Sequence, residues 1–368
     1  MSSLIRYLLL VVLVVGFAVL GFKTLRNKLF YSAVSTKLLL GEEFGLNDKI
    51  NSILAEDVSQ KRVELLKQID DFVKGSVSGK GFSPRVYSLI KIRLDQAFKE
   101  IPNTKVPKGK VKIWYIYNMG VIAKSEDKTI AFDLASSDIY SNLADFTKYI
   151  DIFLITHPHG DHLDLKVVKE ALKNGVMVIV PGDKVLFDET GQLIKDDKGE
   201  DLVSLIKRRQ GIDSENFISL KLREKTMVRG VEITVYPSNH INPGLSEDPN
   251  SIAPFPVTWY YVDLSGVTIL HMGDGDYRFN YQPDFSRKKV DVFITHNADP
   301  KTNDSLVKLV PNAKTILPLH TWELGHGPGN ISNMDYKNVL DDYANGYYKG
   351  VGGKIRFMPM IWGESLLF

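Results

Sequence analysis

One stretch decides the fold of this chain, Ile155-Thr156-His157-Pro158-His159-Gly160-Asp161-His162-Leu163-Asp164. It follows the apolar run 152–155, which is typical of a buried strand, and residues 165–173 have the spacing of an amphipathic helix. Neutral imidazole and carboxylate suit zinc and similar divalent ions, and histidines at i and i+2 of an extended chain point to the same side. Because the whole chain has only eight histidines, a chance cluster is the weaker interpretation, and the stretch predicts a metal site.

Composition excludes several classes of protein. The 46 basic and 44 acidic residues give a net charge of +2, and no basic block is interleaved with aromatic residues, so a nucleic-acid partner is not expected. The absence of cysteine excludes disulfides, thiolate ligands and a cysteine nucleophile. With 368 residues, of which 44% are hydrophobic, the chain can bury a full core and carry an added segment. The oligomeric state stays open.

Residues 1–28 predict a transmembrane anchor or signal segment. Residues 7–22 carry no charge, with Arg6 before them and three basic residues in 23–28 after them. A spanning helix needs about 20 residues, whereas the apolar core of a cleaved signal peptide has about 7–15. We expect an uncleaved helix and therefore a single-pass membrane localisation, with the side of the catalytic domain undecided.

Residues 29–109 predict a helical membrane-proximal segment and a linker. Apolar residues recur at intervals of three and four in 50–72 and 86–98, and Ser83-Pro84 is a typical helix start. This segment carries no group that suggests catalysis. A spacer, a cap over the active site, an oligomerisation face and a structural support are the open alternatives.

Residues 110–368 predict an α/β domain, because short β-branched and aromatic runs alternate there with helical patterns. Two sheets faced by helices are the natural packing for such a pattern. The segment 151–157 (Asp-Ile-Phe-Leu-Ile-Thr-His) is echoed at 291–296 (Asp-Val-Phe-Ile-Thr-His). The echo favours two similar halves whose strands end at a shared site.

The segment His157-Pro-His159-Gly-Asp161-His162 resembles the HxHxDH signature of the metallo-β-lactamase fold superfamily. Further matching elements follow in order: His240, Asp274 in Met-Gly-Asp, and His320 after Leu-Pro-Leu, with Asp133 after an earlier apolar strand. The resemblance covers residues 111–368 and implies an αββα sandwich, here preceded by the transmembrane helix and the small helical segment. Within the superfamily, the chain is most similar to the branch of ascorbate-phosphate lactonases and acyl-ethanolamine phospholipase D-like enzymes.

The resemblance implies two divalent metal ions, zinc in the first place and Mn²⁺ or Fe²⁺ as alternatives. The implied ligands are His157, His159 and His240 for one ion, Asp161, His162 and His320 for the other, and Asp274 between them. A carboxylate suits the bridge because it has two oxygens. The implied reaction is hydrolysis of a phosphodiester, a phosphorylated lactone or a related ester by a metal-bridging hydroxide.

Other residues are expected around the metals. Asp161, His296 and Asp133 are assigned catalytic roles, Asp133 by orienting a ligand. The expected substrate contacts are Arg278, Tyr277 and His326.

Three alternatives to this function stay open: a phospholipase D-like hydrolase of membrane lipid, a mononuclear-metal enzyme, and a non-catalytic metal-stabilised protein of the same fold. The di-iron oxygen-reducing members are disfavoured because they carry a glutamate where this chain has His159. The expected partners are a small-molecule or lipid ester substrate and the membrane, through the N-terminal helix.

Overall fold

The computed structural model describes residues 42–53, 59–75, 83–135, 140–182, 202–241, 254–275, 285–296, 308–322, 335–345 and 355–368. The chain divides into two compact units, Met1–Lys49 and Ile50–Phe368. The sheets and the site described below belong to the second unit.

The first sheet, as described, has seven strands in the order β14-β1-β2-β3-β4-β5-β6. Their bounds are β1 (Lys112–Tyr117), β2 (Gly120–Lys124), β3 (Thr129–Phe132), β4 (Ile152–Leu154), β5 (Met177–Val180), β6 (Phe217–Ser219) and β14 (Ser365–Leu367). Strands β3 to β6 run parallel to one another. Parallel strands are covered on both faces, which explains why the sequence of β4 is a continuous apolar run.

The second sheet also has seven strands within the described residues, in the order β13-β12-β11-β10-β9-β8-β7. Their bounds are β7 (Lys225–Val228), β8 (Val231–Ile241), β9 (Pro254–Leu264), β10 (Val267–His271), β11 (Val290–His296), β12 (Ala313–Leu319) and β13 (Arg356–Phe357). Here β10 to β13 are the parallel strands. The two sheets therefore have the same plan.

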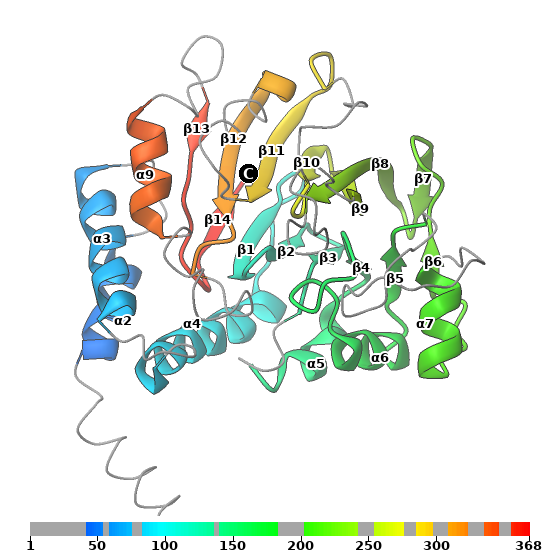
Figure 1. Ribbon diagram of the computed structural model, residues 1–368, viewed down its shortest axis with the longest axis horizontal. Coiled ribbons are helices and arrows are strands. Elements are labelled where there is room, and N and C mark those ends of the chain that lie inside the picture. Colours follow the sequence, from blue (N-terminus) through cyan, green and yellow to red (C-terminus); the bar gives the residue numbers. More distant parts are fainter. Residues whose placement is uncertain are drawn as a thin grey trace, which may run out of the picture. The chain divides into compact units, whose positions relative to one another are not determined.

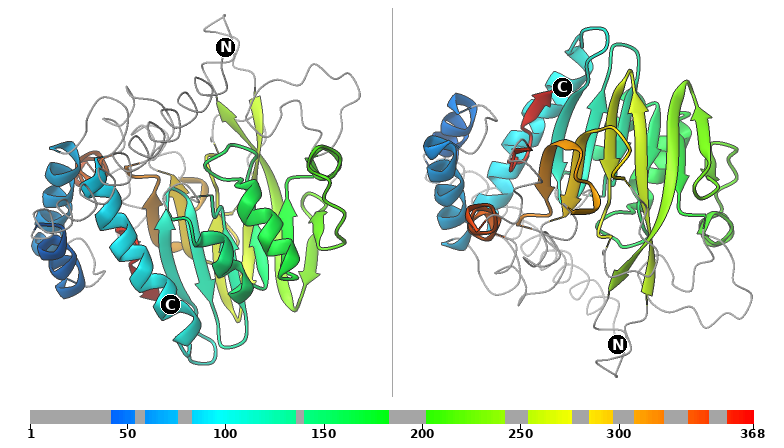
Figure 2. Two further views of the ribbon diagram at one scale, coloured as in Figure 1. Left: turned by 90° about the horizontal axis from the view of Figure 1, so that it is seen from below. Right: turned by 90° about the horizontal axis from the view of Figure 1, so that it is seen from above.

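Several helices of the second unit lie along its sheets. The described helices are α2 (Glu42–Ser52), α3 (Gln60–Lys74), α4 (Pro84–Asn103), α5 (Leu143–Phe146), α6 (Leu165–Lys173), α7 (Leu202–Gln210), α9 (Tyr336–Ala344) and a 3-10 turn, Thr147–Tyr149. Figures 1 and 2 show α4, α5 and α6 along the first sheet, and α9 beside β13. On the second sheet, Val339 of α9 belongs to an apolar cluster with Phe293 and Ile316.

The inner faces of the sheets meet and are joined by hydrogen bonds. The Tyr260 hydroxyl of β9 donates to the carbonyl of Ile155 (2.8 Å), and the Thr258 amide donates to the carbonyl of Thr156 (2.9 Å). Both bonds lie where β4 ends and the histidine-rich stretch begins. The expected α/β architecture with two sheets is confirmed.

The internal echo of the sequence corresponds to equivalent places in the two sheets. Asp151, just before β4, accepts a hydrogen bond from the Thr129 amide at the start of β3 (2.8 Å). Asp291, in β11, accepts one in the same way from the Thr268 amide in β10 (2.9 Å). Each aspartate thus fixes the register of two neighbouring parallel strands at their amino ends, so that their carboxyl ends lie level at the site.

Helices α3 and α4 are joined to the C-terminal part of the chain by buried polar contacts. The guanidinium of Arg62 in α3, which has no exposed surface, binds both carboxylate oxygens of Glu364 and the carbonyl of Pro359. Arg93 of α4 donates from Nε to the carbonyl of Trp362 (3.0 Å). These contacts attach the helical segment to the edge of the first sheet.

The expected single-pass membrane localisation is corrected. Among the described residues, no helix is both long and apolar enough to span a bilayer. The longest of them, α4, is amphipathic, and its charged residues keep one face polar. Residues 1–28, on which the expected anchor depended, lie outside the described residues.

Replacing Arg62 by alanine should lower the free energy of unfolding by about 3–5 kcal/mol, because Glu364 would keep a buried charge without its partner. Urea denaturation measures this change. The control is Lys91→Ala, which breaks an exposed ion pair with Asp95 and should cost less than about 1 kcal/mol. Equal losses in the two variants would contradict the prediction.

The contribution of Asp291 to stability should depend on pH. Burial alone would raise the pKa of Asp291, but Lys289, Lys314 and Thr268 outweigh it and lower the pKa to about 2. The contribution is therefore present above the ordinary value of 3.8 and is lost as the pH falls through about 2. The difference in Tm between wild type and Asp291→Asn should shrink between pH ~4 and ~2. A constant difference would contradict this assignment.

Candidate metal centre

Histidine and aspartate side chains from both sheets converge at the carboxyl ends of the parallel strands. They form two groups, Asp161, His162, Asp274 and His320 on one side and His157, His159 and Asp274 on the other. Within each group, one ligand atom of every residue lies within 4.8 Å of the others. The loop after β4 supplies four of these residues, the turn after β10 supplies Asp274, and the end of β12 supplies His320.

The first group is organised around His157. Its Nε2 lies 2.9 Å from Nδ1 of His159 and 3.8 Å from Oδ2 of Asp274. The hydroxyl of Thr156 donates to Asp133 (2.7 Å), so its oxygen is available to accept from Nδ1–H of His157 at 3.1 Å. This assignment of the proton leaves a lone pair on Nε2 of His157, which faces the other two side chains.

The second group is organised around His162, which is fully buried. Its Nε2 lies 3.2 Å from Oδ1 of Asp274 and 3.4 Å from Oδ2 of Asp161. On the opposite side of Asp274, Nε2 of His320 lies 3.5 Å from Oδ2. Asp274 is therefore the carboxylate that both groups share.

Asp133 orients His162 through Nδ1, the ring nitrogen that does not face Asp161 and Asp274. Its Oδ2 lies 2.9 Å from Nδ1 of His162, and its Oδ1 accepts the amide of Thr156 at 2.7 Å. A carboxylate that binds Nδ1–H leaves Nε2 of the imidazole as the ligand nitrogen. Asp133 reaches this place from a residue with φ of 45°, directly after β3.

Two glycines allow the turn that carries Asp274. A Cβ at Gly273, which has φ of 53°, would lie 2.4 Å from the Thr156 hydroxyl. A Cβ at Gly275 would lie 1.9 Å from Nε1 of Trp259. The Gly-Asp-Gly sequence is thus explained by two close approaches, of Gly273 to Thr156 in the loop after β4 of the first sheet and of Gly275 to Trp259 in β9 of its own sheet.

Asn118, in the turn between β1 and β2, is a site residue that the sequence did not indicate. Its side-chain amide donates to Oδ2 of Asp161 (2.8 Å), and its carbonyl accepts the backbone amide of His320 (3.1 Å). It therefore holds two ligands of the second group. No spacing or motif could have indicated it, since its partners lie far from it in sequence. The role of Thr156 was also not predicted, although it adjoins the histidines, because its contact with Asp133 depends on how β3 and β4 pair.

The charges at the site favour a cation between the carboxylates. Burial opposes a charge on His162 and lowers its pKa, but Asp274, Asp161 and Asp133 together raise the pKa well above its ordinary value. Burial likewise raises the pKa of Asp274, but His162 and His320 hold it well below its usual range. The carboxylates therefore stabilise positive charge at Nε2 of His162, which a proton or a metal ion can supply.

The residues fit divalent metal ions. Nε2 of His162 has no hydrogen-bond partner among the described residues, although it is buried and lies between two carboxylates. Buried imidazole nitrogens normally have hydrogen bonds, so a further ligand is expected there. A set of imidazole and carboxylate ligands without sulfur is suitable for zinc, manganese and iron.

The remaining predicted residues are placed as follows. His296 ends β11, and its ring centroid lies 6.1 Å from that of His320. Residue 240 lies in β8, where the backbone pairs it with residue 255 of β9, but its side chain is outside the described part. Tyr277, Arg278 and His326 also lie outside the described residues.

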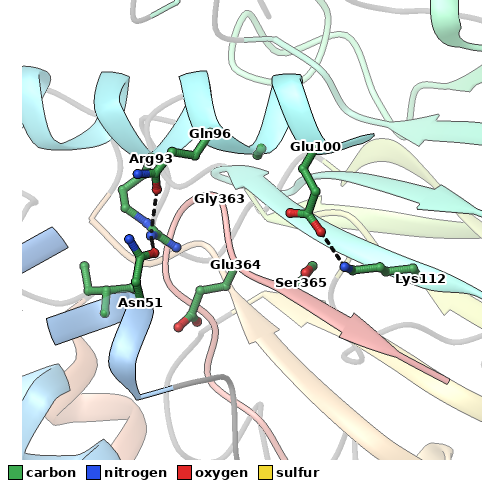
Figure 3. A pocket seen from close by; sticks show the side chains of 10 residues that line it. Asn51, Arg93, Gln96, Glu100, Lys112, Gly363, Glu364 and Ser365 are labelled. Atoms are coloured by element: carbon green, nitrogen blue, oxygen red, sulfur yellow. Dashed lines mark hydrogen bonds and ion pairs between the residues drawn. The ribbon is translucent and has the colours of Figure 1, made fainter. Parts of the chain in front are cut away.

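A cavity of about 270 Å³ lies at the opposite end of β1 from Asn118 (Figure 3). It is lined by Ile50 and Asn51, by α4, by the start of β1 and by residues 363–365. Its charged groups bind neighbouring residues: Lys112 pairs with Glu100, and Arg93 donates to Asn51 and Gln96. These charged and polar groups of the cavity are thus paired with one another.

Comparisons with solved structures gave similar folds at low sequence identity. Igni18, a metallo hydrolase from Ignicoccus hospitalis, is 15% identical with a TM-score of 0.48, over 70% of this chain and 98% of that one. YhfI from Bacillus subtilis, a metallo-β-lactamase fold protein, is 13% identical with a TM-score of 0.47, over 70% and 99%. Isothiocyanate hydrolase from Delia radicum gut bacteria is 16% identical with a TM-score of 0.45, over 70% and 99%.

A comparison with curated proteins gave no match. The family model described as beta-lactamase superfamily domain matches residues 113–320, which is more than half of the 368 residues. The narrower resemblance to ascorbate-phosphate lactonases and acyl-ethanolamine phospholipase D-like enzymes stays a prediction. The chain belongs to the beta-lactamase superfamily, and its expected assignment as a metal-dependent hydrolase of the metallo-β-lactamase fold is confirmed at this level.

Proposed function

We propose that this chain is a dinuclear hydrolase that acts on a phosphodiester, a phosphorylated lactone or a related ester. One observation carries the proposal: Asp274 belongs to both groups of ligands, with Oδ1 toward His162 and Oδ2 toward His157 and His320. A single carboxylate with ligands on both sides is suited to contact two ions. If the site held one ion, the remaining residues of one of the two groups would have no metal to bind.

The proposed ligands follow from this arrangement. His157, His159 and Asp274 would hold one ion, with His240 as the further expected ligand. Asp161, His162, His320 and Asp274 would hold the other. Zinc is the first choice, with Mn²⁺ or Fe²⁺ as alternatives. Two bound divalent ions lower the pKa of water, polarise the scissile group and stabilise the leaving oxygen.

The charge of the site supports the substrate class. Asp161 and Asp274 are the only carboxylates in the two described groups, so two divalent ions would leave the site positive. A positive site favours a substrate that carries or develops negative charge at phosphorus or at an acyl carbon. Arg278, Tyr277 and His326 stay predicted substrate contacts.

Protein side chains hold the reacting groups in place. Asn118 orients Asp161, and Asp133 orients His162. His296 is half-buried beside His320 and is proposed to donate a proton to the leaving group.

Metal analysis combined with an ester panel tests the proposal. The wild-type protein should bind about two ions per chain, and Asp161→Ala should retain about one and lose roughly 10²–10³-fold in hydrolysis of a bis-aryl phosphodiester, as expected for loss of a group that supports transition-state charge. The control is Asp164→Asn, which keeps a capping side chain at the start of α6 and should change neither value.

Two outcomes would contradict the proposal. One ion per chain in the wild type, or turnover unchanged in Asp161→Ala, would exclude the dinuclear mechanism. A protein loaded with two ions that hydrolyses no phosphodiester, phosphorylated lactone or carboxylic ester in the panel would exclude the substrate class.

The role of Asp133 gives a separate test. Asp133→Asn should weaken binding of one of the two ions by about 10–100-fold, because Nδ1 of His162 loses its charged partner. Competition with a chromophoric chelator measures the affinity. The control is Asp151→Asn. Asp151, like Asp133, accepts a hydrogen bond from a backbone amide in or near β3 or β4, but it lies at the end of β4 that is away from the candidate ligands. Equal affinities in wild type and Asp133→Asn would remove Asp133 from the site.

A further inference from the structure

A buried carboxylate in the N-terminal helical segment reaches the neighbourhood of the metal ligands. Asp70 lies on α3 and is 2% exposed. Its Oδ1 accepts hydrogen bonds from Nε1 of Trp322 (2.7 Å) and from the amide of Tyr336 (3.0 Å). Its Oδ2 accepts the amide of Lys337 at 2.8 Å. All of these donors lie more than 250 residues away in sequence, as the separations of 252, 266 and 267 show.

Trp322 is two residues beyond the metal ligand His320, and the backbone between them is strained. His320 has φ of 66° and Trp322 has φ of 52°, in the left-handed region that costs a non-glycine residue about 1–3 kcal/mol. Such residues keep this conformation only where the surroundings hold them. The loop 320–322 therefore needs support from both sides.

The two supports are different parts of the chain. On one side, the end of β1 and the following turn hold the loop: the Tyr117 hydroxyl donates to the carbonyl of Trp322 (3.3 Å), and the carbonyl of Asn118 accepts the amide of His320 (3.1 Å). On the other side, Asp70 holds the Trp322 indole. The indole is 1% exposed, so water does not replace this bond.

The cost of placing a charge at this position argues against a purely stabilising role. Burial raises the pKa of Asp70 to about 6. The hydrogen bonds from Trp322, Tyr336 and Lys337 lower the pKa, but their effect is smaller than that of burial. An ionised Asp70 therefore lowers the stability of the folded chain near neutral pH. In return, its two oxygens fix the indole of Trp322 relative to the first turn of α9.

We propose that Asp70 is a positioning residue for the metal held by Asp161, His162, His320 and Asp274, and that it acts through Trp322 on the backbone of His320. The inference rests on the proposed two-metal site. It makes α3 a part of the metal centre and gives the N-terminal helical segment a function that neither a spacer nor an oligomerisation face would have.

Titration of the metal-free protein with Co²⁺ tests the proposal, because each bound cobalt gives its own visible absorption. Wild type should bind two ions. Asp70→Asn should bind the first as wild type does, and should bind the second about 10-fold more weakly or worse, with an altered spectrum for that ion, as is usual when the support of a ligand is lost.

A second variant keeps the test valid if Asp70→Asn does not fold. Trp322→Phe keeps the ring but removes the N–H that Asp70 accepts, and it should weaken the same step by a similar factor. In the second cobalt step, the double variant should be no weaker than the weaker single variant, because both substitutions act through the contact between Asp70 and Trp322. Independent, additive losses would overturn the proposed connection.

Arg62→Met is the matched control. Arg62 also lies on α3 and also makes a buried polar contact with the C-terminal part, but it binds Glu364 and Pro359 instead of the His320 loop. It should lower stability and leave both cobalt steps unchanged. If wild type binds one cobalt, the proposed function fails; if wild type and Asp70→Asn bind two with equal constants and spectra, the role of Asp70 fails.

Discussion

Asp274 is a carboxylate buried where the two sheets meet, and the described ligands are arranged around it. Burial alone would raise the pKa of Asp274 and disfavour its ionised form. His162 beside Oδ1 and His320 beside Oδ2 outweigh burial and hold the pKa well below the ordinary range. The turn that carries it passes so close to Thr156 and Trp259 that both neighbours of Asp274 must be glycine. The close packing around this turn therefore also fixes the position of Asp274 among the candidate ligands.

The two halves of the fold contribute to this site in an equivalent way. Asp151 and Asp291 bind the amino ends of neighbouring strands in their own sheets, and β4 and β11 both lead into a Thr-His pair, Thr156-His157 and Thr295-His296. In the first half, the histidine is a ligand candidate and is followed by three more ligand residues. In the second half, it lies beside His320. The same plan thus provides ligands from one sheet and a candidate proton donor from the other.

The helical segment makes several buried polar contacts with the C-terminal part of the chain, one of them beside the candidate ligand His320. Arg62 and Arg93 bind the C-terminal part at Glu364 and Trp362, and Asp70 binds Trp322 beside a ligand. Buried charges contribute little to stability compared with apolar residues of similar size. We expect their contribution to be specificity of placement, because a buried ion pair or charged hydrogen bond is satisfied in only one register between two parts of a chain.

The sequence alone was sufficient for the fold class and for the superfamily, and it named histidine and aspartate residues that the structure brings together in two candidate groups. Helix α6 agrees with the expected bounds, 165–173, because its apolar period is a local property. The short strands β6, β7 and β14 are defined by pairing with a neighbouring strand more than by their own composition.

Only the tertiary structure decided which groups support the ligands. Asn118 and Asp70 carry no motif, and each binds a residue more than 40 positions away. Thr156 lies in the histidine-rich stretch, but its contact with Asp133 follows from the pairing of β3 with β4. The division of the described ligands into two groups around Asp274 likewise depends on how two sheets face each other. The sequence determined the chemistry of the site, since imidazole and carboxylate are properties of single residues; the geometry that can make this chemistry selective depends on contacts between distant segments, which only folding brings together.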